Sequence, residues 1–241
     1  MASSKVRLYV DHPLGAGQPV ALSREQAHYL FAVMRLGVGD TLAVFNGVDG
    51  EWRATIDMVA KRGGSIRADA RSRALQFPPD LWLLFAPIKK ARTDFIVEKA
   101  TELGAARILP VQTAFTNSER IRRDRLQAHV IEAAEQCGGT YVPEVAELRK
   151  LDAVLADWPA DRQLIFCDEA AVGTKHTLQA ANPATSWAIL IGPEGGFSPA
   201  ERDRLMGLPQ VTRISLGPRI LRADTATVAA MTLWQAKLGD W

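Results

Sequence analysis

Residues 81–86, Leu-Trp-Leu-Leu-Phe-Ala, form an unbroken apolar run, and this run constrains the fold more than any other segment. A strand that faces water on one side alternates apolar and polar residues, whereas a strand covered on both faces is apolar throughout. A helical pattern follows at 90–103 and ends at Gly104. An apolar strand followed directly by a helix is the unit from which parallel α/β sheets are built.

This alternation of strand and helix continues to the end of the chain. We expect strands at 107–111, 163–167, 187–191 and 211–216, and helices at 119–136, 148–157 and 223–238. The pattern predicts an α/β domain over residues 81–241, with a mostly parallel sheet and helices on both faces. Residues 74–80 have no period and contain Pro78 and Pro79, so we expect a linker there.

Residues 1–73 have a different pattern, in which short strands surround one helix. The strands are expected at 5–10, 41–45, 51–59 and 65–70, and the sequence Asn-Gly-Val-Asp-Gly at 46–50 suits a hairpin loop. Ser23 and Gln26 have capping-box spacing, which predicts a helix over 24–35 that ends before Gly37 and Gly39. These features together predict a small β-barrel.

The composition excludes several classes of protein. With 241 residues, 47% hydrophobic and 23% charged, the chain has the make-up of a soluble globular protein. No signal peptide or membrane-length apolar run is recognisable, so we expect a cytoplasmic protein that binds no membrane. Two cysteines, Cys137 and Cys167, and four histidines without ligand spacing predict neither a disulfide framework nor a metal site. We expect both cysteines to be buried and structural.

The formal net charge of +2 is unevenly distributed. Residues 1–73 carry 10 Lys and Arg against 7 Asp and Glu, whereas the rest of the chain carries 19 against 20. A basic excess in the first domain suits an anionic partner, although a solvated surface without a partner can carry as much.

A glycine-rich loop follows the strand expected at 187–191. It reads Gly-Pro-Glu-Gly-Gly-Phe at 192–197, and Ser198, Pro199 and Glu201 then begin a helix. The loop lacks the lysine and the spacing of a phosphate loop, and the carboxylate of Glu194 would repel phosphate. A neutral or cationic ligand, such as a nucleoside or a sulfonium, fits better. The alternative is a tight turn that needs glycine for geometry alone.

A second loop with a Gly-Pro pair leads into the terminal helix. Residues 217–226 read Gly-Pro-Arg-Ile-Leu-Arg-Ala-Asp-Thr-Ala and offer Arg219, Arg222 and Asp224. Helix capping and solvated arginines would explain each residue taken singly. Ligands of open α/β sheets gather at the carboxyl ends of strands, so we expect the two loops to form one site.

Four segments resemble the RsmE family, which methylates N3 of a uridine in 16S ribosomal RNA and belongs to the SPOUT superfamily. They are Glu-Lys-Ala-Thr-Glu-Leu-Gly at 98–104, Glu-Ala-Ala-Glu-Gln-Cys-Gly at 132–138, and the loop segments 191–198 and 216–222. Residues 28–30, 34–36 and 45–47 of the first domain are also similar. The resemblance spans nearly the whole chain.

The resemblance implies a PUA-like RNA-binding β-barrel at 1–73, a linker at 74–80, and a SPOUT methyltransferase domain with a trefoil knot at 81–241. It also implies a homodimer, S-adenosylmethionine as cofactor, and 16S ribosomal RNA of the small ribosomal subunit as partner. The cofactor-binding residues that it implies are Phe166, Cys167, Gly192, Pro193, Glu194, Gly195, Gly196, Leu216, Gly217, Ile220 and Leu221, with Asp168 beside them.

The expected reaction is direct in-line methyl transfer without a covalent intermediate. We expect Arg222 to stabilise negative charge on the uracil carbonyls, and Asp224 or Glu194 to take the N3 proton or to orient Arg222. The expected RNA contacts are Arg35, Arg53, Lys89, Arg92 and Arg219, and further arginines of the first domain are Arg62, Arg67, Arg71 and Arg73.

The chain departs from the family pattern at three positions. Asp224 stands where glutamate is frequent, and Gly139 and Phe115 stand where arginine is common. The last two changes remove cations that would contact RNA. Two other functions stay open, namely methylation of a different RNA and a non-catalytic role as an RNA-binding ribosome-assembly factor.

Overall fold

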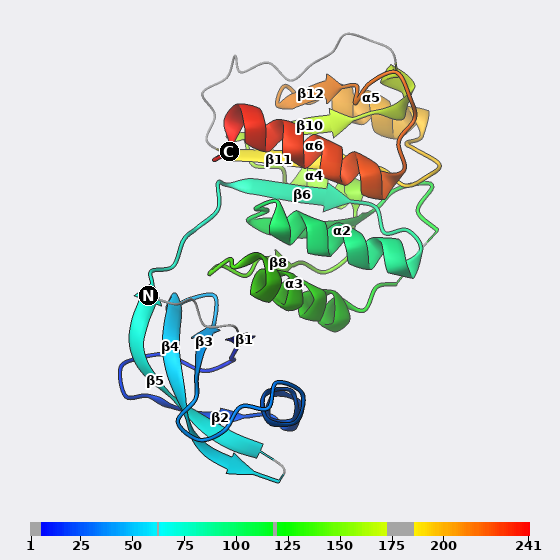
Figure 1. Ribbon diagram of the computed structural model, residues 1–241. Helices are drawn as coiled ribbons and strands as arrows, with labels where there is room; N and C mark the ends of the chain where they lie inside the picture. The colour runs from blue at the N-terminus through cyan, green and yellow to red at the C-terminus, as the bar shows by residue number, and fades with distance from the viewer. Residues whose placement is uncertain (1–5, 62, 118–119, 173–185) are drawn as a thin grey trace. The chain divides into compact units, whose positions relative to one another are not determined.

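The computed structural model describes residues 6–61, 63–117, 120–172 and 186–241 (Figure 1). The chain divides into two compact units, of which the first comprises Met1–Phe77 and Ala134–Val142 and the second Pro78–Ala133 and Pro143–Trp241. The division between Phe77 and Pro78 falls within residues 74–80. The inclusion of residues 134–142 in the first unit had no counterpart in the sequence analysis. Arg62 lies outside the described residues.

The second unit is built on a parallel sheet, as its apolar strands predicted. The strands are β6 (Leu81–Phe85), β7 (Arg107–Gln112), β8 (Glu144–Val145), β9 (Arg149–Lys150), β10 (Arg162–Cys167), β11 (Ser186–Ile191) and β12 (Val211–Ile214). Their order is β12-β10-β11-β6-β7-β8, with β9 on β7, and every pairing in this sheet is parallel. The expected α/β class with a mostly parallel sheet is confirmed.

Helices cover both faces of this sheet. They are α2 (Lys90–Glu102), α3 (Arg123–Cys137), α4 (Leu151–Ala156), α5 (Pro199–Met206) and α6 (Ala223–Leu238). On one face α6 packs against β11 and α2 (Figure 1). On the other face Leu155 of α4 and Leu205 of α5 join one core with Leu84, Leu164 and Leu190.

The terminal helix packs on its own unit. Its apolar residues Met231 and Trp234 are buried there. Two helix starts differ from expectation, because α3 begins at Arg123 rather than at 119, and β9 occupies Arg149–Lys150 before α4. A trefoil knot is a property of the whole chain path, which includes residues 173–185 outside the described ranges, so the knot stays a prediction. Within the described ranges, no helix is long and apolar enough to cross a membrane.

The first unit is a five-stranded sheet around one core. Its strands are β1 (Arg7–Tyr9), β2 (Pro19–Leu22), β3 (Thr41–Phe45), β4 (Glu51–Ala60) and β5 (Gly63–Arg73), in the order β1-β3-β4-β5-β2. Inward side chains of all five strands, among them Leu8, Val20, Leu42, Ile56 and Ile66, meet in a single apolar cluster. β2 was missed because it is short and begins with a proline, a residue that is confined to strand ends and edges.

The single helix of the first unit begins as expected and then changes type. Ser23 and Gln26 form the capping box, and α1 covers only Arg24–Ala27. The chain continues as the π-helix η1 (His28–Val33), in which Met34 N donates to the carbonyl five residues back, Tyr29 O, at 2.9 Å. The prediction of an α-helix over 24–35 was therefore wrong in type after Ala27. Arg35, with φ of 58°, ends the helical path.

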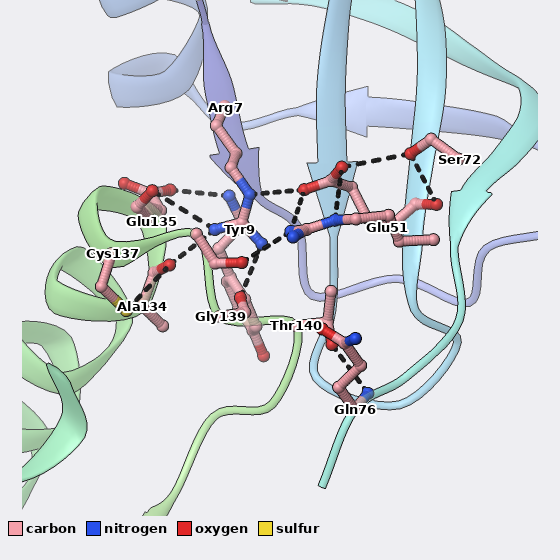
Figure 2. A network of polar contacts seen from close by, with 12 residues as sticks. Arg7, Tyr9, Glu51, Ser72, Gln76, Ala134, Glu135, Cys137, Gly139 and Thr140 are labelled. Carbon is pink, nitrogen blue, oxygen red and sulfur yellow. Dashed lines mark hydrogen bonds and ion pairs between the residues drawn. The ribbon is translucent and has the colours of Figure 1, made fainter. Parts of the chain in front are cut away.

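A polar network centred on Arg7 attaches residues 134–142 to the strands of the first unit (Figure 2). Arg7 Nη1 donates to Ala134 O and Nη2 donates to Gly139 O, both at 2.6 Å. Its Nε donates to Glu51 Oε2 at 2.6 Å. Carbonyls at the end of a helix lack partners within the helix and carry partial negative charge. Arg7 thus caps the last turn of α3.

Glu51 links Arg7 to a second arginine of this network. The side chain is nearly buried, and Arg73 Nη2 donates to Glu51 Oε2 at 2.9 Å. Burial by itself would raise the pKa of Glu51, but the hydrogen bonds and charges of Arg7 and Arg73 outweigh it and hold the pKa below its usual value. A carboxylate whose pKa is lower in the folded state stabilises the fold at neutral pH, and the stabilisation is lost as the pH falls below the usual glutamate range.

We predict that Glu51→Gln destabilises the first unit by about 3 kcal/mol or more at neutral pH, because it removes one partner of a buried ion pair. The measurement is hydrogen exchange of the β3 and β4 amides. Asp57→Asn is the control, since its ion pair with Arg67 is exposed on both sides and its loss costs less than about 1 kcal/mol. Below about pH 4 the difference between Glu51→Gln and wild type should shrink. Equal effects of the two substitutions would contradict the role of Glu51.

Candidate functional site

Three parallel strands of the second unit end at the same level. β10 pairs with both β11 and β12, and the register sets Cys167 opposite Ile191 on one side and Ile214 on the other. Asp168 N continues this pairing by donating to Ile214 O at 3.3 Å. The loops that follow the three strands therefore begin side by side at one edge of the sheet, where ligands of open α/β sheets bind.

A cavity open to solvent lies among these loops and the first turn of α6. Such concave sites at strand ends are typical places for small ligands to bind. The lining residues are Cys167, Asp168, Glu169, Val172, Ile191, Gly192, Pro193, Glu194, Leu216, Arg219, Ile220, Leu221, Ala223 and Ala226. Both Gly-Pro loops thus contribute to a single site.

Most residues predicted to bind cofactor lie at this cavity. Those in its wall are Cys167, Gly192, Pro193, Glu194, Leu216, Ile220 and Leu221, whereas Gly195, Gly196 and Gly217 lie in the same loops but not in the wall. Phe166 lies elsewhere. Alternation along β10 directs its side chain to the opposite face from Cys167, and there it packs edge-on against Phe197, with ring centroids 4.9 Å apart.

The glycine-rich loop is held rigidly at the cavity. Gly196 has φ of 68° and its N donates to Pro193 O at 3.0 Å, which closes a turn around Glu194. The positive φ favours glycine at this position, and a Cβ would also require the carboxylate of Glu169 to move. The following helix begins with the predicted capping box, in which Ser198 N donates to Glu201 Oε2 at 2.8 Å.

A buried carboxylate with two arginines lies beneath this loop. The side chain of Asp168 is fully buried, Arg202 Nε donates to its Oδ1 at 3.2 Å, and Arg213 Nη2 lies 2.6 Å from Oδ2. Arg202 also contacts Glu169. This cluster ties together the end of β10, α5 and β12. Sequence reasoning missed Glu169, Arg202 and Arg213, because they come from separate elements and no local spacing connects them.

The charged residues of the cavity wall differ in whether they are paired. Those residues are Asp168, Glu169, Glu194 and Arg219. Arg202 and Arg213 neutralise the first two from behind. Glu194 is exposed and forms no ion pair with any residue in the described ranges. Its charge therefore remains available at the opening.

The expected catalytic residues flank the cavity. Arg222 is the N-cap residue of α6, lies between the lining residues Leu221 and Ala223, and is exposed. Among the residues that the structure describes, its guanidinium has no ion-pair partner. Asp224 instead lies 3.7 Å from Arg92, measured from Oδ2 to Nε. The structure thus joins an expected catalytic carboxylate to an expected RNA contact.

The other expected RNA contacts are exposed in one or the other unit. In the second unit, Arg219 lies in the cavity wall and Lys89 immediately precedes α2. In the first unit, Arg35 is exposed beyond η1, and Arg53 Nε lies 3.8 Å from Asp69 Oδ2. A separation of that length between exposed groups holds Arg53 only weakly, so its charge is free to meet phosphate.

The two cysteines differ in environment. Burial raises the pKa of the Cys167 thiol far above its usual value, so the thiol stays protonated at neutral pH and is no nucleophile. Cys137 is exposed at the end of α3, contrary to the expectation that it is buried. In the part of the chain that the structure describes, no three His, Cys, Asp or Glu side chains are grouped to hold a metal ion.

Comparison with known families gives two matches. The family model for an RNA methyltransferase domain matches residues 76–235, and that for an RNA methyltransferase PUA domain matches residues 22–67. The ribosomal RNA small subunit methyltransferase E of Synechocystis is 30% identical over 91% of this chain and 73% of its own length. The same enzyme from Rickettsia conorii is 29% identical over 93% of both chains.

Two solved structures are similar over nearly their whole length. A Legionella pneumophila protein, solved with the cofactor S-adenosylmethionine bound, has 30% identity and a TM-score of 0.87 over 100% of both chains. The ribosomal RNA small subunit methyltransferase E of Neisseria gonorrhoeae, bound to S-adenosylmethionine, has 26% identity and a TM-score of 0.82 over 98% of this chain and 99% of that one. The chain described here belongs to the family of ribosomal RNA small subunit methyltransferase E, with a PUA domain followed by a SPOUT-type methyltransferase domain.

Proposed function

We propose that this protein transfers a methyl group from S-adenosylmethionine to N3 of one uridine in the 16S RNA of the small ribosomal subunit. The observation that carries the proposal is the cavity at the ends of β10, β11 and β12, with Glu194 at its opening and Arg222 at its edge. The curated relatives reported above are named as methyltransferases of small-subunit ribosomal RNA, and both similar solved structures contain S-adenosylmethionine. The family also implies a homodimer, which stays a prediction.

The residues that line the cavity suit S-adenosylmethionine in chemistry. Apolar side chains of Ile191, Leu216 and Leu221 offer a surface for a flat purine, and backbone groups of the two loops offer hydrogen bonds. The carboxylate of Glu194 attracts a sulfonium. Bound there, the cofactor would supply the methyl group. The chain's own part is to hold the uracil and the sulfonium at attack distance, which contributes roughly 7–11 kcal/mol in favourable cases.

Arg222 is the residue that we assign to the uracil. N3 carries a proton at neutral pH and lies on the pairing edge, so the base must be unpaired and must lose this proton as the new N–C bond forms. Negative charge then develops on the two carbonyls beside N3. The exposed guanidinium of Arg222 can donate to a carbonyl oxygen, and one such donor contributes about 10²- to 10³-fold in rate.

Of the two carboxylates left open by the sequence, Glu194 is the better candidate for proton acceptor. Asp224 Oδ2 lies 3.7 Å from Arg92 Nε, and its side chain is only 19% exposed, so it is less accessible to a substrate. Glu194 lines the cavity and keeps its side chain exposed. Asp224 is then a positioning residue, which directs Arg92 toward RNA.

The function itself is tested by mapping modified nucleosides. We expect 16S RNA from cells that lack this gene to lose a single N3-methyluridine, detected by mass spectrometry of RNA fragments, and purified protein with S-adenosylmethionine to restore it. Loss of a methyl group from another RNA would favour the alternative target. Unchanged RNA would favour the non-catalytic alternative.

We predict that Arg222→Ala lowers kcat by about 10²- to 10³-fold, because a charge-stabilising donor is lost. Calorimetry should find the affinity for S-adenosylmethionine nearly unchanged, since Arg222 is not in the cavity wall. Arg149→Ala is the matched control, because that exposed arginine pairs only with groups near α4 and should leave kcat intact. Full activity of Arg222→Ala would refute the assignment of Arg222 but not the proposed function.

The roles of the two carboxylates can be separated by pH. We predict that Glu194→Gln lowers kcat by about 10²-fold near neutral pH and that raising the pH partly restores it, because the N3 proton then leaves to solvent. Asp224→Asn should instead raise KM for RNA with a smaller effect on kcat, since it frees Arg92. Steady-state kinetics across a pH series measures both. Rescue of Asp224→Asn, rather than Glu194→Gln, by alkaline pH would reverse the assignment.

A further inference from the structure

An exposed aromatic side chain lies beside the glycine-rich loop, in a position that neither the cavity nor the expected site residues include. We propose that Phe115 stacks on an unpaired base of the RNA at the rim of the cavity, where it determines RNA affinity. The proposal rests on the proposed function and adds to it the kind of contact, namely base stacking, and the residue that makes it.

The backbone around Phe115 is fixed. It lies in the turn 113–116 after β7, in which Thr116 N donates to Thr113 O at 3.2 Å and Thr113 N donates to Thr116 Oγ1 at 2.9 Å. Ala114 N donates to Glu201 Oε1 at 2.8 Å, which attaches the turn to the capping box of α5. An aromatic ring on a rigid turn loses little conformational entropy when a ligand stacks on it.

The turn places Phe115 against the loop that carries Glu194. A Cβ built on Gly195 would lie 3.0 Å from Phe115 Cβ, so the two backbones are as close as a glycine allows. Gly195 is the residue after Glu194, which lines the cavity opening. Phe115 therefore lies against the residue next to Glu194, the group that we assign to the uracil proton.

Packing within the chain does not explain this ring. Phe115 is 46% exposed, although a phenylalanine at the end of a buried strand is usually covered. RNA bases that are splayed out of a helix stack on aromatic rings, and each such contact is worth about 1–3 kcal/mol. A stacking contact depends little on salt, unlike a contact between a basic side chain and phosphate.

The test compares four variants with wild type, each with a short single-stranded oligouridylate and with small ribosomal subunits that lack the methyl group. Phe115→Ala removes the ring, Phe115→Trp keeps an aromatic face, and Phe115→Leu keeps apolar bulk without one. Trp241→Ala is the control, because it also removes an exposed aromatic side chain, 64% exposed. Trp241 follows the C-terminal end of α6, whereas the cavity lies at the N-terminal end of that helix. Fluorescence anisotropy measures Kd for the oligonucleotide, kinetics measures KM for subunits, and calorimetry measures Kd for S-adenosylmethionine.

Stacking predicts that Phe115→Ala raises Kd and KM for RNA by about 5- to 150-fold, the equivalent of 1–3 kcal/mol. Affinity for S-adenosylmethionine should not change, Phe115→Trp should match wild type, and Trp241→Ala should have no effect. Equal RNA affinity of Phe115→Leu and wild type, or of Phe115→Ala and wild type, would overturn the proposal. Failure of wild type to methylate any RNA would instead refute the proposed function, and the oligonucleotide affinities would still decide whether Phe115 stacks.

A further substitution distinguishes stacking from a simple basic contact. Phe115→Arg should bind RNA with a salt dependence of log Kd that is steeper than that of wild type by about 0.7, the value for one added phosphate contact on single-stranded RNA. Wild type and Phe115→Trp should share the shallower slope. A wild-type slope as steep as that of Phe115→Arg would contradict the proposal.

Discussion

The parallel pairing of β10 with both β11 and β12 is the constraint on which the candidate site depends. Because the register ends all three strands at one level, the loops that follow them begin side by side at the same edge of the sheet. The cavity also requires small residues in these loops and an anchor, meaning a contact that holds the neighbouring elements together. Asp168 supplies this anchor, since its buried carboxylate holds Arg202 of α5 and Arg213 of β12.

The same arrangement leaves the carboxylate of Glu194 exposed at the cavity. The carboxylates in its wall that lie deepest are neutralised from behind by arginines, and Glu194 is left at the opening. A phosphate site would need the opposite polarity, with backbone N–H groups or cations at that point. Arg222 precedes α6, and Phe115 lies beside Gly195. The two side chains to which we assign contacts with RNA therefore come from different loops.

Sequence reasoning predicted the elements that depend on local pattern. The apolar run at 81–86, the capping boxes at Ser23 and Ser198, and the terminal helix at 223–238 all have counterparts in the structure. What it could not predict depends on contacts across the chain. The capping of α3 by Arg7 and the ion pair between Asp224 and Arg92 join residues that are far apart in the sequence. The π-helix after Ala27 is local, but the capping box that begins the helix does not distinguish it from an α-helix. Phe166 was misplaced relative to the cavity because a strand alternates its side chains between faces.

Hydrogen exchange of the whole protein with and without S-adenosylmethionine tests the central claim most directly, because it locates the cofactor without requiring a substrate. The cavity at the strand ends predicts protection of amides in three segments, 167–169, 191–196 and 216–221, together with the first turn of α6. Protection confined to another part of the chain, such as the polar hollow lined by Thr113, Lys150 and Arg204, would contradict it. So would the absence of any protection at a saturating concentration of the cofactor.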